Sequence, residues 1–128
     1  MKTIKLLLVD DDPKVRRGLR MRLELEPDVE VVGEAGDGSA AIEVARRLAP
    51  DVIVMDVEMP VMDGITATRE VRASSPAAVV VLSMHDDPAI ASRARAAGAA
   101  AFVAKHCMDG VLVDAIRRAS EERRTCRE

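Results

Sequence analysis

Aromatic residues are almost absent from the sequence, in which Phe102 is the only one among 128 residues. Proteins that bind single-stranded nucleic acid stack bases on aromatic side chains, so this composition disfavours that function. Positive charge is not in excess either, because 19 lysines and arginines stand against 22 aspartates and glutamates and leave a net charge of −3. Without a basic surplus the chain has no general attraction for nucleic acid. We therefore expect protein partners.

Cysteines and long apolar runs are also scarce. The two cysteines, Cys107 and Cys126, form no CxxC pair and no disulfide framework, so we expect reduced thiols. No apolar run approaches the length of a transmembrane helix. The first residues lead into a short apolar segment ended by three aspartates, which lacks the features of a signal peptide. These features predict a soluble cytoplasmic protein without membrane contact.

The length suits one domain, spanning residues 1–128, with a core of aliphatic side chains. Five short apolar segments are expected to be strands: residues 4–9, 29–32, 52–55, 78–82 and 100–104. Helical periodicity fills the stretches between them; the first helix is expected to begin at Pro13, with Asp12 as its N-cap, and the last near Met108. This alternation predicts an α/β fold, a doubly wound parallel sheet of five strands flanked by five helices.

Polar residues follow the expected strands at the point where each strand ends. They are Asp10, Asp11, Asp56, Ser83 and Lys105. Any one of them alone could be a solvated strand end. Right-handed crossovers, however, place the carboxyl ends of all parallel strands on the same edge of the sheet. We therefore expect these side chains to meet on one rim, where open α/β sheets bind ligands.

The residue types on this rim indicate phosphoryl chemistry. Three carboxylates close together repel one another unless a cation lies among them. Oxygen ligands without histidine or cysteine favour a hard divalent ion, and we expect Mg²⁺. The Lys105 ammonium and the Ser83 hydroxyl could then contact a phosphoryl group. Such a site supports phosphoryl transfer, in which positioning and charge neutralisation supply most of the catalysis.

Four segments carry a family resemblance. They are Leu7-Leu8-Val9-Asp10-Asp11, the ten residues 55–64 (MDVEMPVMDG), Val81-Leu82-Ser83 and Phe102-Val103-Ala104-Lys105. Together they resemble the marker segments of a two-component response-regulator receiver domain, and the resemblance covers nearly the whole chain. The residues 83–87 and the Asp-Asp-x-Pro start are most similar to the NarL/FixJ type. The resemblance implies a flavodoxin-like fold with strand order 2-1-3-4-5.

The resemblance also implies roles at the rim. Asp56 would accept a phosphoryl group from the phosphohistidine of a sensor histidine kinase, and Lys105 would contact that group. Asp10, Asp11 and Asp56 would hold Mg²⁺ together with the backbone carbonyl of Glu58.

Switching is implied as well. Ser83 would move toward the new phosphoryl group, and Phe102 would turn inward behind it. The face made by the fourth helix, fifth strand and fifth helix would then change and bind a partner or a second copy.

Receivers of this type usually precede a helix-turn-helix domain. Contact with DNA is therefore expected only through an output domain that this chain lacks, and the last residues of the chain would begin the linker to that domain. A stand-alone receiver is the alternative.

Some positions depart from the common family pattern. Met84 follows Ser83 where a small residue is frequent, and His106 follows Lys105 where proline is common. Glu58 adds a carboxylate near the metal site, and we hypothesise that Glu58 and His85 help to set the phosphate lifetime. The basic first helix is either a solvated face or a docking surface for the kinase, with Arg16 and Arg20 as its candidates.

Three other functions compete with the receiver. Residues 36–41 match the GxGxxA pattern of dinucleotide-binding proteins through Gly36 and Gly38, but that function leaves the polar rim unexplained. An aspartyl phosphatase would use Asp10 as its nucleophile, but Lys14 occupies the position of the expected threonine or valine. A receiver-like binding module that is never phosphorylated is the third alternative.

Overall fold

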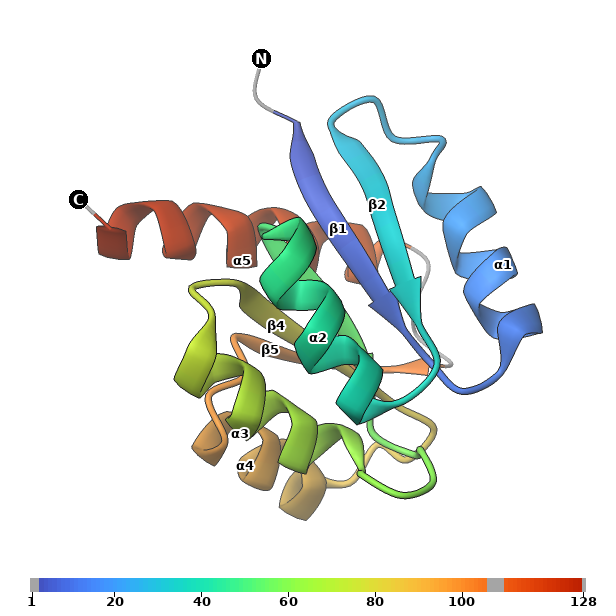
Figure 1. Ribbon diagram of the computed structural model, residues 1–128, viewed down its shortest axis with the longest axis vertical. Coiled ribbons are helices and arrows are strands. Elements are labelled where there is room, and N and C mark those ends of the chain that lie inside the picture. The colour runs from blue at the N-terminus through green and yellow to red at the C-terminus, as the bar shows by residue number, and fades with distance from the viewer. Residues whose placement is uncertain (1–2, 106–109, 128) are drawn as a thin grey trace.

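The strands form one parallel sheet, in which the order is β2-β1-β3-β4-β5 (Figure 1). The computed structural model describes residues 3–105 and 110–127, without the side chains of 124–127. The strands are β1 (Ile4–Val9), β2 (Val29–Ala35), β3 (Val52–Asp56), β4 (Ala78–Ser83) and β5 (Ala101–Ala104). This topology confirms the predicted five-stranded sheet of flavodoxin-like order.

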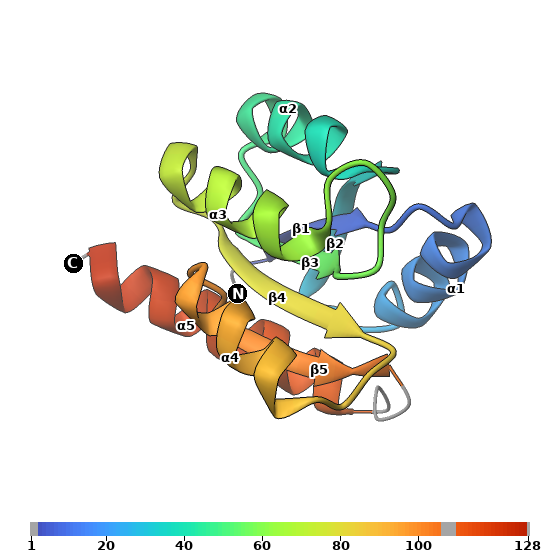
Figure 2. The ribbon, with the colours of Figure 1, turned by 90° about the horizontal axis from the view of Figure 1, so that it is seen from below.

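Helices cover both faces of the sheet (Figure 2). The helices are α1 (Pro13–Leu23), α2 (Gly38–Leu48), α3 (Gly64–Ser74), α4 (Pro88–Ala96) and α5 (Val111–Arg127). Alternate residues of β3 point to opposite faces: Val52 and Val54 pack in the cluster under α1 and α5, and Ile53 and Met55 in the cluster under α2, α3 and α4. Burial on both faces explains why the central strands are unbroken apolar runs.

Aspartates fix where four of the helices begin. They are Asp12, Asp37, Asp63 and Asp87, and each side chain accepts a hydrogen bond from a backbone N–H in the first turn of its helix. Such caps satisfy donors that the helix itself leaves unpaired. The predicted N-cap role of Asp12 is confirmed, because its Oδ1 accepts the Lys14 N–H at 2.9 Å.

The edge strand β2 is longer than predicted. The sequence pattern placed its end at Val32, but pairing with β1 continues to Ala35 across a register shift, since Leu6 pairs with Val31 and Leu7 with Gly33. A glycine inside a strand commonly marks such a bulge. The start of the last helix near Met108 was predicted from residues that lie outside the described part of the chain, as do His106 and Cys107.

In the described helices, no segment is long and apolar enough to cross a membrane.

Candidate functional site

The acidic residues of the rim lie at the ends of adjacent central strands. Val9 of β1 pairs with Met55 of β3. The next residues, Asp10 and Asp56, are therefore neighbours at the ends of these adjacent strands. Both are buried, at 2% exposure, whereas Asp11 is exposed. Each of the three offers a carboxylate oxygen, and these oxygens lie within 4.8 Å of one another. The structure therefore brings together three residues that are distant in the sequence, as predicted.

Lys105 enters the same cluster from the end of β5. Its Nζ lies 3.1 Å from Asp56 Oδ1 and 3.5 Å from Asp10 Oδ2. Burial lowers the pKa of Lys105, but the hydrogen bond to Asp56 and the charges of Asp56, Asp10 and Glu58 outweigh burial and raise it. Lys105 is therefore a firmly protonated ammonium beside the central carboxylate.

Asp56 is poised by opposing effects. Burial, and next the charge of Asp10, raise the pKa of Asp56 from its ordinary value of 3.8 to about 6, against the lowering effect of Lys105. Crowded carboxylates shift in this direction when a single ammonium cannot neutralise them. The ionised carboxylates therefore carry more negative charge than Lys105 neutralises, and a further cation would stabilise them.

A buried oxygen of Asp10 indicates where such a cation would bind. Asp10 Oδ2 is buried and accepts no hydrogen bond, although buried polar atoms in proteins nearly always have a partner. A divalent cation held by Asp10, Asp11 and Asp56 would satisfy it. The acidic cluster therefore fits a metal ion, and its all-oxygen donors suit a hard one.

We expect this crowding to depress stability in the absence of metal. Because the folded pKa of Asp56 lies above its ordinary value, the folded state keeps a proton that the unfolded chain has lost between pH 3.8 and about 6. Stability due to this group therefore falls as pH rises through that window. In EDTA, Asp56→Asn should raise the free energy of unfolding at pH 7 by about 2 kcal/mol. Urea unfolding of both proteins at pH 7 and pH 4 checks this, and an equal gain at both pH values would contradict it.

The β3–α3 loop brings α3 back against the end of β3. Val57 N donates to Leu82 O at 2.9 Å and thereby fixes the loop to β4, and Gly64 N donates to Val57 O at 3.0 Å. A Cβ on Gly64 would lie 2.0 Å from the carbonyl oxygen of Asp56. Only glycine therefore permits α3 to begin this close to Asp56.

The same loop contains a strained residue. Val61 has φ of 70° and is fully exposed, while Met62 N donates to Pro60 O across it. A β-branched residue is a poor choice for this left-handed backbone.

Glycine at this position should stabilise the protein. We expect Val61→Gly to raise the free energy of unfolding by about 1 kcal/mol, since relief of the strain exceeds the entropic cost of glycine. The matched control, Val111→Gly, replaces an exposed valine in α5 without a positive φ and should destabilise. Urea midpoints of the three proteins compare them, and a loss of stability in Val61→Gly would refute the strain.

The Glu58 side chain was predicted to lie near the metal site; its charge acts on Lys105, and its hydrogen bonds are to the end of β4 and the first residue of the β4–α4 loop. Its Oε2 accepts the Ser83 hydroxyl at 2.8 Å and its Oε1 accepts the Met84 N–H at 2.9 Å. Ser83 Oγ in turn accepts the His85 N–H at 3.1 Å. Ser83 thus lies at the rim, as predicted, with its proton already engaged. No sequence pattern indicates the contact between Glu58 and Ser83, because it joins residues 25 positions apart through a flexible side chain.

Phe102 lies behind the rim on β5. It pairs with Val81 and packs, half-buried, on the face covered by α2, α3 and α4. Its place beside β4 is compatible with the prediction that Phe102 turns inward when Ser83 moves toward a phosphoryl group.

The two arginines suggested for kinase docking are occupied within the chain. Arg16 donates to Glu34 and to the backbone carbonyl of Asp10, and Arg20 donates to the other oxygen of Glu34. Arg16 is only 19% exposed in its side chain. Charge reversal at these positions would break contacts between α1 and β2, so it cannot isolate a docking effect. Arg16 supports the rim through its bond to the Asp10 carbonyl, and docking of a kinase on α1 stays a prediction.

Of the two glycines that match the dinucleotide pattern, Gly36 and Gly38, the second has a packing role. A Cβ on Gly38 would lie 2.9 Å from Met62 Sδ and 3.0 Å from Ala67 Cβ. The N-terminus of α2 is also capped by an acidic side chain, Asp37, whose charge would repel a pyrophosphate. The geometry therefore gives no support to a dinucleotide site.

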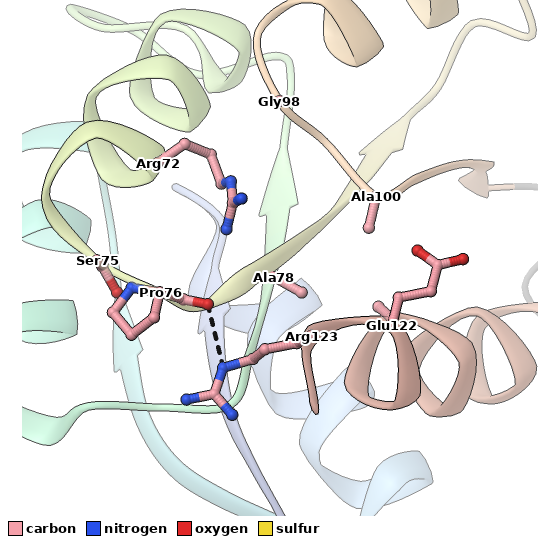
Figure 3. Close-up of a pocket in the computed structure, with 9 residues that line it drawn as sticks. Arg72, Ser75, Pro76, Ala78, Gly98, Ala100, Glu122 and Arg123 are labelled. Carbon is pink, nitrogen blue, oxygen red and sulfur yellow. Dashed lines mark hydrogen bonds between the residues drawn. The ribbon is translucent and has the colours of Figure 1, made fainter. Parts of the chain in front are cut away.

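A cavity of about 490 Å³ lies at the opposite edge of the sheet (Figure 3). Arg72 Nη1 donates to Ala77 O at 2.8 Å, and Arg123 Nε donates to Pro76 O at 3.1 Å. Arg123 also forms an ion pair with Asp51 at 3.1 Å. These arginines brace the ends of α3 and α5, and the cavity is separate from the polar rim.

Comparisons with known proteins give the same family as the residues of the rim. Residues 6–117 match the model of the response regulator receiver domain. The transcriptional regulatory protein LiaR of Bacillus subtilis is 43% identical over 120 residues, which are 92% of this chain and 56% of LiaR. A protein-glutamate methylesterase/protein-glutamine glutaminase of Alkalilimnicola ehrlichii is 44% identical over 83% of this chain and 28% of its own length. The chain thus spans about half the length, or less, of these relatives.

A solved structure gives the same result. The signal receiver domain of the response regulator NarL from Mycobacterium tuberculosis superposes with a TM-score of 0.89 at 37% identity, covering 94% of this chain and 98% of that one. Similarity to LiaR and NarL agrees with the predicted NarL/FixJ type. The chain belongs to the response regulator receiver domain family.

Proposed function

We propose that this chain is a phosphorylation-controlled switch whose acceptor is Asp56. The observation that carries the proposal is the buried Asp56 carboxylate, which lies beside Asp10 and 3.1 Å from the Lys105 ammonium at the carboxyl end of β3. A buried nucleophile among a lysine and metal-ligating carboxylates suits phosphoryl transfer.

In the proposed reaction, an oxygen of Asp56 attacks the phosphorus of a histidine kinase's phosphohistidine. The new O–P bond forms as the N–P bond of the donor breaks, and the product is an acyl phosphate. Lys105 would leave its contact with Asp10 and neutralise a phosphoryl oxygen. Asp10, Asp11, Asp56 and the backbone carbonyl of Glu58 would hold Mg²⁺. When bound, the ion would withdraw charge from the phosphoryl oxygens and reduce repulsion by the carboxylates.

The switch would act through the face made by α4, β5 and α5. Ser83 would turn toward the phosphoryl oxygens and Phe102 would follow inward, so that this face changes shape. The changed face would bind a partner or a second copy of the chain. Phosphorylation can shift the equilibrium between the resting and the active conformation only through contacts that differ between them, here those of Ser83 and Lys105.

In the whole protein we propose an output by transcription regulation. LiaR and NarL support this, since LiaR is a transcriptional regulatory protein and this chain matches only 56% of it. Residues 1–128 would then be the receiver domain of a cytoplasmic protein that contacts DNA through a separate domain. Apart from its own phosphorylation and dephosphorylation the receiver would catalyse nothing. That Glu58 and His85 help to set the phosphate lifetime stays a prediction.

Intact mass after incubation with acetyl phosphate and Mg²⁺ tests the proposal. One phosphoryl adduct, absent when EDTA is added, is the expected result. Folded protein that forms no adduct would favour the second candidate, a receiver-like module that binds partners without phosphorylation.

A further inference from the structure

The Glu58 carboxylate joins the loop after β3 to the loop after β4 through its bonds to Ser83 and Met84. We propose that Glu58 is a latch, defined by these two bonds, that holds Ser83 and the β4–α4 loop in the resting position and opposes the switch. Glu58 is thus a positioning residue that sets how readily the chain enters its active state. The inference rests on the proposed function, since it assumes that Ser83 must reach a phosphoryl group.

The Ser83 hydroxyl carries a single proton, and that proton is committed. It is donated to Glu58 Oε2 at 2.8 Å, while Ser83 Oγ accepts the His85 N–H. Ser83 has no measurable exposure, so water does not offer an easy replacement partner. To donate to a phosphoryl oxygen, Ser83 must first break its bond to Glu58. Hydrogen bonds to a charged acceptor are among the stronger ones in proteins, so this step has a substantial cost.

The second oxygen extends the latch to the backbone. Glu58 Oε1 accepts the Met84 N–H at 2.9 Å, which ties down the first residue of the β4–α4 loop. The side chain of Met84 is 65% exposed, so that residue has few contacts of its own to hold it. Movement of Ser83 and movement of the loop therefore require release of the same carboxylate.

The latch is also connected to the acceptor. The Glu58 N–H donates to Asp56 Oδ1 at 3.3 Å, so the resting position of Glu58 depends on the free Asp56 carboxylate. Conversion of Asp56 to an acyl phosphate adds negative charge close to Glu58. Repulsion between the two anions would weaken the latch when the phosphoryl group arrives. The same event would then release Ser83 and offer it a new acceptor.

A simpler alternative is that Glu58 only repels anions through its charge. The two explanations differ in their dependence on Ser83. A latch loses most of its effect when the Ser83 hydroxyl is removed, whereas repulsion by charge does not. A double-mutant cycle therefore separates them.

The experiment uses beryllofluoride with Mg²⁺ as the phosphoryl mimic, on wild type, Glu58→Ala, Ser83→Ala and the double variant. Titration by NMR gives the apparent Kd of each protein. Glu58→Ala should bind beryllofluoride about tenfold more tightly than wild type, as expected for loss of bonds to a charged group. In the Ser83→Ala background, replacing Glu58 by alanine should tighten beryllofluoride binding by about threefold or less, because only the bond from Glu58 to Met84 is then left to lose. Glu58→Gln, which keeps the size of the side chain but not its charge, should lie between wild type and Glu58→Ala.

Amide hydrogen exchange supplies a readout that needs neither metal nor mimic. The Met84 amide should exchange faster in Glu58→Ala than in wild type, and Glu43→Gln, a change at an exposed residue of α2, should alter neither exchange nor Kd.

The outcomes are distinct. An equal gain in affinity with and without the Ser83 hydroxyl, no gain at all, or unchanged Met84 exchange would each overturn the latch and leave the proposed function intact. Absence of beryllofluoride binding in wild type would overturn the proposed function, and the latch with it.

Discussion

We expect Asp56→Asn to form no phosphoryl adduct with acetyl phosphate and Mg²⁺ under conditions in which wild type should form one. The amide oxygen of asparagine is a poor nucleophile, whereas the buried Asp56 carboxylate lies 3.1 Å from the ammonium that would neutralise the incoming group. The loss should be complete by intact mass, because no other carboxylate combines burial, a contact with Lys105 and a place at the end of β3 within the described residues.

A matched variant guards against an indirect effect. Asp86→Asn removes a carboxylate from the exposed β4–α4 loop, near the rim in sequence but outside the acidic cluster. It should be phosphorylated as wild type is. Circular dichroism of both variants checks that they are folded. An adduct of undiminished yield on Asp56→Asn would show that another residue is the acceptor.

Much of this site could be predicted because it depends on local patterns and on one topological rule. Apolar runs alternate with helical periodicity, so the parallel sheet follows, and every strand end then lies on one edge. Asp10, Asp56 and Lys105 meet for that reason alone, although 95 positions separate the first from the last. The N-cap role of Asp12 could be predicted because its bond to the Lys14 N–H spans only two residues.

The parts that could not be predicted depend on side-chain direction. Glu58 is two residues from Asp56, and sequence proximity suggested a place near the metal. The Glu58 charge does act on Lys105, but no periodicity indicates the hydrogen bonds of its carboxylate to Ser83 and Met84. Helical periodicity likewise does not indicate that Glu34, on the neighbouring strand, binds both Arg16 and Arg20.

Gly64→Ala should be the most destabilising change of a single methyl group in the loop that carries Asp56. The added Cβ would lie 2.0 Å from Asp56 O and 2.8 Å from Val57 Cα, and both are backbone atoms that cannot rotate away. Val57 is itself fixed to β4 by its bond to Leu82 O. Overpacking against a rigid neighbour costs about 3 kcal/mol, at the upper end of such effects.

The matched control for this change is Gly18→Ala, in the middle of α1. A Cβ on Gly18 has nothing within 4 Å, so the substitution adds no clash. Alanine is a better helix former than glycine and should raise the free energy of unfolding by about 0.5–1 kcal/mol. Urea unfolding of the two variants should therefore give changes of opposite sign. If Gly64→Ala were as stable as wild type, α3 could move away from β3, and the close contact that shapes the acceptor site would not be required by the fold.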